Sequence, residues 1–393
     1  MSNAVQTIAA EIRRRGAIPF ARFMELALYC PLCGYYEQEA DKIGQRGDYV
    51  TSVSVGSLFG ELLAFQFAAW LAALGAENKA HENGGFQIVE AGAHDGRLAK
   101  DILSWLRHHR PGTFDTLEYW ILETSPRREK WQRDMLREFS SKVCWFADFD
   151  AIAGAGHGAQ DLPHCSTSAP PVNGVIFSNE LLDALPVRRL GWDARAKAWF
   201  EWGVTLDGDR FVWTRLPATT ASPESLQGLM HDAGLSLPSE LAEVLPDGFV
   251  VEVCPAATAW WRQASSLLGR GKLMTLDYGL TADEFFLPQR RHGTLRAYCQ
   301  HRVSDNPLAN PGQQDLTAHV NFTALQAAGT AEGLRTDCFS SQAQFLVRIA
   351  EQTWRVPRAF GDWNAERLRQ FKTLTHPELL GRPFRVLAQS RPA

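Results

Sequence analysis

The feature that most constrains the fold is an alternation of short apolar runs with helical patterns along most of the chain. Apolar runs of strand length lie at 86–90, 117–123 and 174–178. The first two runs are each followed by apolar residues at helical spacing, at 96–112 and 126–139, and Pro111 and Gly112 are expected to stop the first of these helices. Strands that alternate with helices predict an α/β fold with a doubly wound, mostly parallel sheet.

One segment interrupts this alternation. Residues 188–216 alternate with a period of two around the turn Asp207–Gly208, which predicts an inserted antiparallel hairpin. The strand–helix alternation then resumes with apolar runs at 248–254 and 271–279. We therefore expect the hairpin to leave the main sheet, and the later runs to return to it.

These patterns suggest two structural parts. Residues 1–80 are expected to form an N-terminal helical extension that closes over the site, because 4–30 contains two short amphipathic helical patterns. Residues 81–393 are expected to form the main domain, with insertions at about 188–247 and 280–320.

Composition and charge favour an intracellular protein. A net charge of −4 provides no electrostatic footprint for nucleic acid. Seven scattered cysteines are typical of reduced thiols, and residues 1–20 show no secretory signal pattern, so we expect a cytoplasmic location. The apolar segment 61–76 carries Gln66 and is shorter than the roughly 20 residues of a spanning helix. We expect it to be a buried helix, with no membrane association.

The cysteine spacing does not indicate a metal site. Cys30 and Cys33 form a single CxxC pair, and no second pair of ligands follows at a suitable spacing. We expect a loop here and no bound metal.

Polar residues follow the predicted strands at the points where the strands end. They lie at Glu90–Gly96, Glu123, Asn179–Asp183 and Asp277–Gly279. In doubly wound sheets, ligands bind beyond the carboxyl ends of the strands. These residues are therefore the candidates for a functional site.

The glycine cluster after the first of these strands fits one cofactor template better than another. The dinucleotide pattern GxGxxG, begun at Gly92, fails at His94 and Arg97. The pattern acid-x-Gly-x-Gly-x-Gly is typical of S-adenosylmethionine (SAM) methyltransferases; it finds Glu90, Gly92 and Gly96 and departs only at His94. Histidine tolerates positive φ better than most residues, so the turn can still form. A turn required only for packing is the alternative.

Two further strand ends carry carboxylates. Glu123 is placed to accept both ribose hydroxyls of an adenosine, although it could instead favour the helix dipole at Pro126. Asn179, Glu180 and Asp183 could orient a basic nucleophile, since a carboxylate pairs with a guanidinium in a planar, bidentate way. The alternative for these three residues is an N-capping pattern on a short helix.

Most of the chain resembles the MidA family of SAM-dependent methyltransferases, which includes a mitochondrial arginine methyltransferase that assists the assembly of respiratory complex I. The matching segments include "VEAGAHDGRLAKDIL", "ILETSP", "SNELLDALPV", "LDYG", "GTLRAYCQHRV" and "PGQQDLTAHVNF". The resemblance implies a class I methyltransferase fold (Rossmann-like) with an N-terminal helical extension, and SAM as the cofactor. The chain departs from the family at His94, and Val53 and Ser54 replace a usual Pro-Glu pair.

The resemblance also implies roles for individual residues. The implied cofactor-binding residues are Thr51, Ser52, Glu90, Gly92, His94, Gly96, Glu123 and Asn179. The implied catalytic residues are Asn179, Glu180, Asp183 and His319. Other family-motif residues are Gly47, Asp48, Asp277, Tyr278, His301, Asp315 and Thr317.

The implied reaction is in-line transfer of a methyl group to a substrate nitrogen, with an arginine side chain of a protein as the expected acceptor. Two alternatives stay open: a methyltransferase acting on a small molecule, and a non-catalytic assembly factor in which His94 blocks the site. The expected partner is a protein substrate or a small molecule, without nucleic acid or membrane, and a homodimer is possible.

Overall fold

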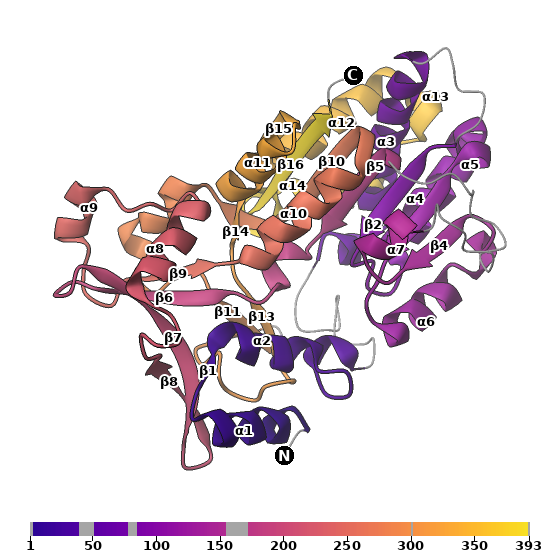
Figure 1. Ribbon diagram of the computed structural model, residues 1–393. Helices are drawn as coiled ribbons and strands as arrows, with labels where there is room; N and C mark the ends of the chain where they lie inside the picture. Colours follow the sequence, from indigo (N-terminus) through magenta and orange to yellow (C-terminus); the bar gives the residue numbers. More distant parts are fainter. Residues whose placement is uncertain (1–2, 39–50, 78–84, 155–171, 300–301, 392–393) are drawn as a thin grey trace.

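An eight-stranded sheet forms the centre of the structure, a computed structural model that describes residues 3–38, 51–77, 85–154, 172–299 and 302–391 (Figure 1). Its strands are β2 (Gln87–Ala91), β3 (Glu118–Leu122), β4 (Val143–Phe146), β5 (Val172–Asn179), β10 (Leu268–Leu280), β14 (Val320–Asn321), β15 (Arg335–Ser341) and β16 (Phe384–Arg391). They lie in the order β15-β16-β10-β5-β2-β3-β4, with β14 beside one end of β10. Pairing is parallel from β10 to β4, whereas β16 is antiparallel to both of its neighbours.

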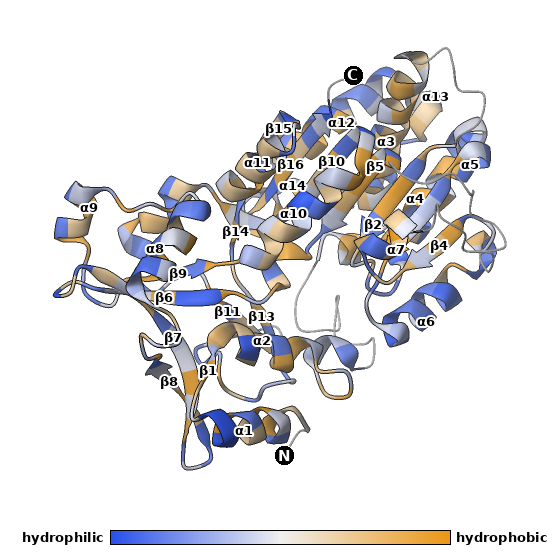
Figure 2. Ribbon diagram, viewed as in Figure 1, coloured by the Kyte–Doolittle hydropathy of each residue, from blue (hydrophilic) through white to orange (hydrophobic). Residues whose placement is uncertain are grey.

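Helices cover both faces of this sheet, as expected for a doubly wound fold. The helices are α3 (Leu58–Glu77), α4 (Arg97–His109), α5 (Pro111–Thr116), α6 (Pro126–Met135), α7 (Phe149–Gly154), α10 (Pro255–Leu267), α11 (Phe322–Ala331), α12 (Gln342–Arg355), α13 (Pro357–Phe360) and α14 (Ala365–Thr375). Consecutive strand residues point to opposite faces, so Ile88 packs with α3, α4 and α12, whereas Val89 packs with α10 and α11. Figure 2 shows the contrast between the apolar central strands and the hydrophilic helix α6.

A second, antiparallel sheet stands beside the first (Figure 1). It consists of β1 (Ile18–Pro19), β6 (Arg188–Asp193), β7 (Ala198–Asp207), β8 (Arg210–Arg215) and β9 (Val250–Val253), and it carries α8 (Pro223–Asp232) and α9 (Ser239–Val244). The β7–β8 hairpin turns at 207–210 and confirms the predicted insertion. A third, small sheet holds β11 (Arg296–Cys299), β12 (Arg302–Ser304) and β13 (Asp315–Thr317).

Short turns complete the described chain. The 3-10 turns are η1 (Tyr35–Glu37), η3 (Val53–Val55), η4 (Arg137–Phe139), η6 (Leu182–Ala184), η7 (Ala282–Phe286) and η8 (Pro288–Arg290), and η9 (Pro377–Gly381) is a π-helical turn. Of these, η1 and η6 matter most for function, because they bring side chains from separate parts of the chain to one place.

The N-terminal helices α1 (Asn3–Arg15) and α2 (Phe20–Tyr29) pack on the inserted hairpin. The ring centroids of Phe20 and Trp213 lie 4.9 Å apart, and those of Phe23 and Phe211 lie 5.6 Å apart. By contrast, α3 belongs to the core of the main sheet. As a packing unit, the extension therefore comprises α1, β1, α2 and η1, and does not reach residue 80.

The helix expected after the first strand was to stop at Pro111 and Gly112, and this is confirmed: α4 ends at His109, and Pro111 begins the separate helix α5. Two other expectations were wrong. The apolar run at 248–254 does not return to the main sheet: β9 pairs antiparallel with β6. The cysteines are not all reduced, because Cys144 is disulfide-bonded.

Helix α3 is longer than its sequence suggested. It has 20 residues, and Leu58–Ala76 is apolar enough to cross a membrane by length and composition alone. Buried core helices pass the same test, and α3 side chains such as Leu62, Leu63 and Phe67 are fully buried against the main sheet. The expected burial of this segment is confirmed.

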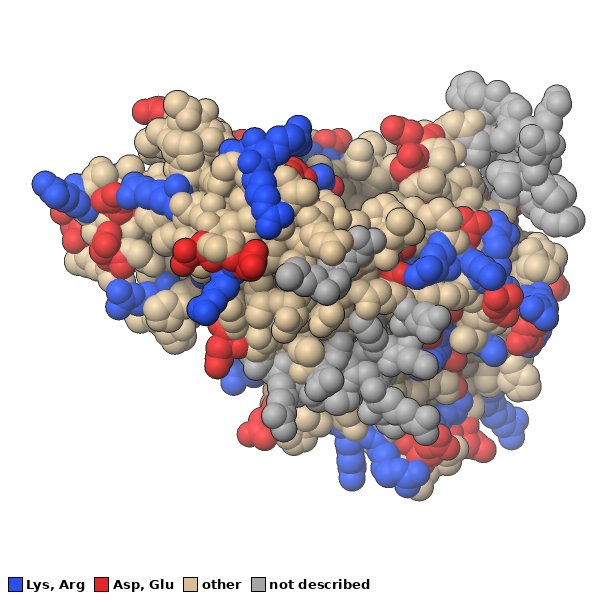
Figure 3. Space-filling model, turned by 90° about the horizontal axis from the view of Figure 1, so that it is seen from below, with Lys and Arg blue, Asp and Glu red and all other residues tan. Residues whose placement is uncertain are grey.

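Figure 3 shows one face of the molecule, on which described residues of both charge signs are interspersed. Such a mixed surface has little long-range preference for ligands of one charge. Selection of a charged ligand then depends on its binding cavity.

Candidate active site

Two cavities lie at the carboxyl ends of the parallel strands, and they share the side chains of Tyr36 and Glu180. The first is lined by Tyr29, Tyr36, Thr51, Val53, Ser54, Glu90, Gly92, Ala93, His94, Asp95, Arg97, Leu98, Glu123, Arg128, Asn179, Glu180, Leu181 and Ala184. The second is lined by Tyr36, Glu180, Asp183, Tyr278, Tyr298, Asp315 and Thr317.

The glycine cluster forms the turn between β2 and α4 at one wall of the first cavity. Gly92 has φ +73°, and a Cβ at this position would lie 2.8 Å from Leu181 Cδ1. Gly96 has φ +84° at the N-cap of α4. His94 itself has φ +48°, so the non-glycine residue adopts the left-handed conformation that its position requires.

Glu90 is buried at the end of β2 and faces the first cavity. Its Oε2 accepts a hydrogen bond of 2.6 Å from the Tyr119 hydroxyl. Burial raises the pKa of Glu90 to about 8, against the lowering effect of that hydrogen bond. A cationic ligand beside Glu90 would lower this pKa, because a nearby positive charge favours the ionised form of a carboxyl group.

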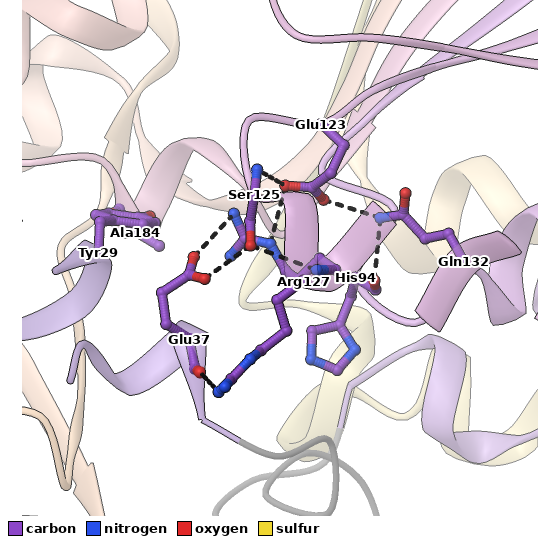
Figure 4. A network of polar contacts seen from close by, with 9 residues as sticks. Tyr29, Glu37, His94, Glu123, Ser125, Arg127, Gln132 and Ala184 are labelled. Carbon is purple, nitrogen blue, oxygen red and sulfur yellow. Dashed lines mark hydrogen bonds and ion pairs between the residues drawn. The ribbon is translucent and has the colours of Figure 1, made fainter. Parts of the chain in front are cut away.

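Glu123, just beyond β3, lies at the centre of a polar network (Figure 4). Its Oε1 accepts from the Ser125 backbone N–H at 2.9 Å and from Arg128 Nε at 2.9 Å. Its Oε2 accepts from Gln132 Nε2 at 2.8 Å, and the same nitrogen donates to the His94 carbonyl at 3.0 Å. Gln132 therefore connects this carboxylate to the glycine turn.

Glu180 follows β5 in a strained conformation, with φ +50°. The Ser52 backbone N–H donates to Glu180 Oε1 at 3.1 Å, and Asn179 Nδ2 donates to the same atom at 3.2 Å. Burial raises the pKa of Glu180 to about 8. The backbone strain thus places a carboxyl that can hold a proton at neutral pH at the junction of the two cavities.

Asp277 holds the turn that follows Glu180. It lies in β10, is fully buried, and accepts the N–H groups of Leu181 at 3.2 Å and Leu182 at 2.8 Å. Burial raises its pKa to about 7. Asp183 on η6 is also buried, and burial together with the nearby Asp277 and Asp315 raises its pKa well above the usual range.

The second cavity is acidic with aromatic walls. Three carboxyl groups (Glu180, Asp183 and Asp315) and three tyrosines line it. The Tyr36 hydroxyl, from the N-terminal extension, donates to Asp315 Oδ1 at 2.7 Å. No lysine or arginine is among the described residues of its lining. This chemistry is complementary to a cation with a flat π face.

The structure brings most of the candidate residues together. Thr51, Glu90, Gly92, His94, Glu123, Asn179 and Glu180 line the first cavity, and Asp183 lines the second. Gly96 is the N-cap of α4, and Ser52 reaches the site through the hydrogen bond from its N–H to Glu180. Gly47, Asp48 and His301 lie outside the described residues.

His319 is the exception among the candidate residues, since it lines neither cavity. Its backbone N–H donates to Thr294 Oγ1 at 3.1 Å, and burial together with Arg290 and Arg296 lowers its pKa to about 4. Its imidazole Nδ1 is buried and has no hydrogen-bond partner among the described residues.

Sequence reasoning missed several lining residues. Tyr29 and Tyr36 flank the CxxC loop, Arg128 lies on α6, and Tyr298 lies on β11. The aromatic density of "LYCPLCGYY" was the available signal for the first two. For Arg128 the sequence offers only a charged residue on a hydrophilic helix.

A family comparison shows to which family the chain belongs. Residues 62–340 match the model of a family described as "Putative S-adenosyl-L-methionine-dependent methyltransferase". The chain belongs to this methyltransferase family. The resemblance to the MidA family, the class I fold, the enzyme class and SAM as cofactor are thereby confirmed.

Relatives of this methyltransferase extend over nearly its full length. A Burkholderia thailandensis protein, whose crystal structure contains S-adenosyl-homocysteine (SAH), is 30% identical and has a TM-score of 0.78, with 99% of this chain and 92% of that chain covered. A Drosophila melanogaster mitochondrial protein arginine methyltransferase (NDUFAF7 homolog) is 26% identical over 97% of this chain and 83% of its own length. Its Danio rerio counterpart is 25% identical over 97% and 85%.

The expected cytoplasmic location is contradicted by these relatives. The curated animal proteins that the methyltransferase matches are named mitochondrial. Charge and cysteine count cannot make this distinction, because both compartments hold soluble proteins of similar composition.

Proposed function

We propose that this methyltransferase transfers the methyl group of SAM to the guanidinium of an arginine in a protein. The observation that carries the proposal is the acidic, tyrosine-walled second cavity, which meets the first cavity at Glu180. Carboxylates pair with guanidinium groups in a bidentate way, and aromatic rings stack on their planar faces. The names of the animal relatives as protein arginine methyltransferases support this choice of acceptor.

The first cavity fits SAM by its chemistry. Glu90, Asp95 and Glu180 offer carboxyl groups to a ligand that carries a sulfonium and an ammonium group. Asn179 lines the cavity, and its buried Oδ1 has no hydrogen-bond partner among the described residues, so it can accept from a ligand. In our proposal Glu123 accepts from the ribose hydroxyls, and Gly92, His94 and the turn around them hold the methionine end.

When bound, SAM supplies an electrophilic methyl group. The residues of the second cavity would hold the guanidinium with one nitrogen directed at the first cavity. A guanidinium nitrogen becomes a nucleophile only as it loses a proton, and Glu180 or Asp183 can receive that proton. The base must be ionised before attack, and the positive charges of SAM and the guanidinium favour that form. Burial raises the pKa of both groups, which makes the ionised carboxylate a stronger base.

Labelled SAM tests the acceptor. The protein is incubated with methyl-labelled SAM and arginine-containing peptides or host lysate, and labelled protein is hydrolysed to amino acids. The proposal expects methylarginine. Label in a small molecule would indicate the small-molecule alternative, and SAM binding without any transfer would indicate an assembly factor.

Glu180→Gln tests the proposed base. We expect methyl transfer to fall about a hundredfold or more, the scale on which positioned acid–base and electrostatic assistance acts. SAM affinity should fall far less, because Glu90 and Asp95 keep their carboxyl groups in the first cavity. Melting temperature, SAM affinity and turnover are measured on the same variant. Preserved turnover per folded molecule, with a lower melting temperature, would show that Glu180 only supports the turn at 180–185.

A further inference from the structure

Glu123 has too few free acceptor positions for both ribose hydroxyls. An ionised carboxylate offers about four lone-pair positions. Three of them are taken in the structure, by the Ser125 N–H, Arg128 Nε and Gln132 Nε2. One hydroxyl can be added without change, but a second requires one of these donors to leave.

Arg128 is the donor best able to leave. The Ser125 N–H belongs to the backbone at the N-cap of α6, which cannot move without unfolding the first turn. Gln132 is fully buried and also bonds the His94 carbonyl and Trp145 Nε1. Only Arg128 has a second carboxylate nearby: its Nη2 lies 3.9 Å from Glu37 Oε1.

Glu37 joins the N-terminal extension to the start of α6 (Figure 4). Its Oε2 accepts from Ser125 Oγ at 2.7 Å, and its carbonyl accepts from Arg127 Nη1. Glu37 is buried, yet it lines neither cavity. It lies next to Tyr36 on the turn η1, and Tyr36 is a shared wall of both cavities.

We propose that Arg128 is a positioning residue that leaves Glu123 for Glu37 when the cofactor ribose binds, so that cofactor binding fastens the turn carrying Tyr36 to α6. This rests on the proposed function, in which Glu123 accepts the ribose hydroxyls. Arg128 keeps a carboxylate partner throughout, which makes the exchange possible for a buried guanidinium. The Tyr36 wall of the acceptor cavity is then held more firmly when the cofactor is bound.

Calorimetry with SAH and its 2′-deoxy analogue tests the exchange. Glu37→Gln keeps an acceptor for Ser125 Oγ but removes the charge that receives Arg128. We expect SAH to bind this variant about fivefold or more weakly, the lower end of typical coupling between sites. The 2′-deoxy analogue fills only the free position on Glu123, so its affinity should not change.

Arg128→Met supplies the second variant, and it carries the test alone if Glu37→Gln does not fold. With Glu123 already free, the preference for SAH over the 2′-deoxy analogue should rise about fivefold above that of the wild type. In this background Glu37→Gln should have no further effect on either ligand. An unchanged preference, or a Glu37→Gln effect equal for both ligands, would overturn the exchange.

The outcomes separate this inference from the proposed function. Wild-type protein that binds SAH and the 2′-deoxy analogue equally would remove Glu123 from the ribose site. Wild-type protein that prefers SAH, with a preference insensitive to Glu37 and Arg128, would remove only the exchange.

Discussion

Glu90 and Glu180 both face the first cavity as carboxyl groups that burial keeps protonated to about pH 8. Neither has a lysine or arginine within ion-pair distance among the described residues. A buried acid without a cationic partner costs stability unless it stays neutral or a cation binds. The two residues therefore form a site whose charge depends on its ligand.

A pH dependence of stability and binding follows from these two pKa values. In the unfolded chain such groups titrate near 4.5, whereas in the folded protein they titrate near 8. The folded state thus binds more protons between these values, so this contribution to stability is complete below pH 4.5 and is lost as pH rises through 8.

Cationic SAM favours the ionised carboxyls. We expect SAM affinity to rise with pH up to about 8, with protons released on binding.

Calorimetry in buffers of different ionisation enthalpy measures this proton release. SAH lacks the sulfonium charge and is the matched control: its affinity should depend less on pH. Equal pH dependence for SAM and SAH would mean that the two carboxyls do not sense the sulfonium.

Local sequence was sufficient to identify those residues whose role depends on their own position in a strand or turn. The glycine pattern located Gly92 and Gly96, and the positive φ expected to be tolerable at His94 is present. Tyr36 and Arg128 could not be located in this way, because each reaches the site only through packing between distant segments, as the Tyr36–Asp315 bond illustrates. The cofactor and catalytic roles of the individual residues stay predictions.

At the scale of elements, the turn between β2 and α4 and the turn after β5 determine each other's shape. Gly92 lies against Leu181, and Leu181 is adjacent to Glu180. Contacts between distant elements also explain why residues 248–254 were wrongly expected to join the main sheet. Its apolar run fits either sheet, and only its antiparallel pairing with β6 decides between them.

Gly92→Ala should disturb both turns. Alanine at φ +73° costs roughly 1–2 kcal/mol, and its Cβ would press on Leu181 Cδ1, 2.8 Å away. We expect a lower free energy of unfolding by at least that amount and weaker SAM binding, measured by denaturant unfolding and calorimetry. Gly248→Ala is the matched control, because Gly248 has φ +71° and a Cβ there has no neighbour within 4 Å. Equal effects of the two changes would contradict the contact between the turns.

At the scale of the whole molecule, the active site joins two separate cores. The main sheet supplies Glu90, Glu123 and Glu180, whereas Tyr29 and Tyr36 come from an extension that packs on the inserted hairpin. The insertion therefore has a structural task, because it supports the extension through the contacts of Phe20 and Phe23 with Trp213 and Phe211. A strand–helix pattern could predict the main sheet, but not which surface the extension would use.

Separate cores predict separate local stabilities. Phe23 is fully buried between the extension and the hairpin, so Phe23→Ala should cost about 3–5 kcal/mol there. Amide hydrogen exchange should accelerate in α2 and in β7–β8, while β2, β3 and β5 keep their protection. Phe67→Ala, in α3 of the main core, is the matched control and should accelerate exchange in the central strands. If Phe23→Ala loosened the central strands as much as Phe67→Ala does, the two cores would unfold as one unit, and the extension could not respond independently to the cofactor.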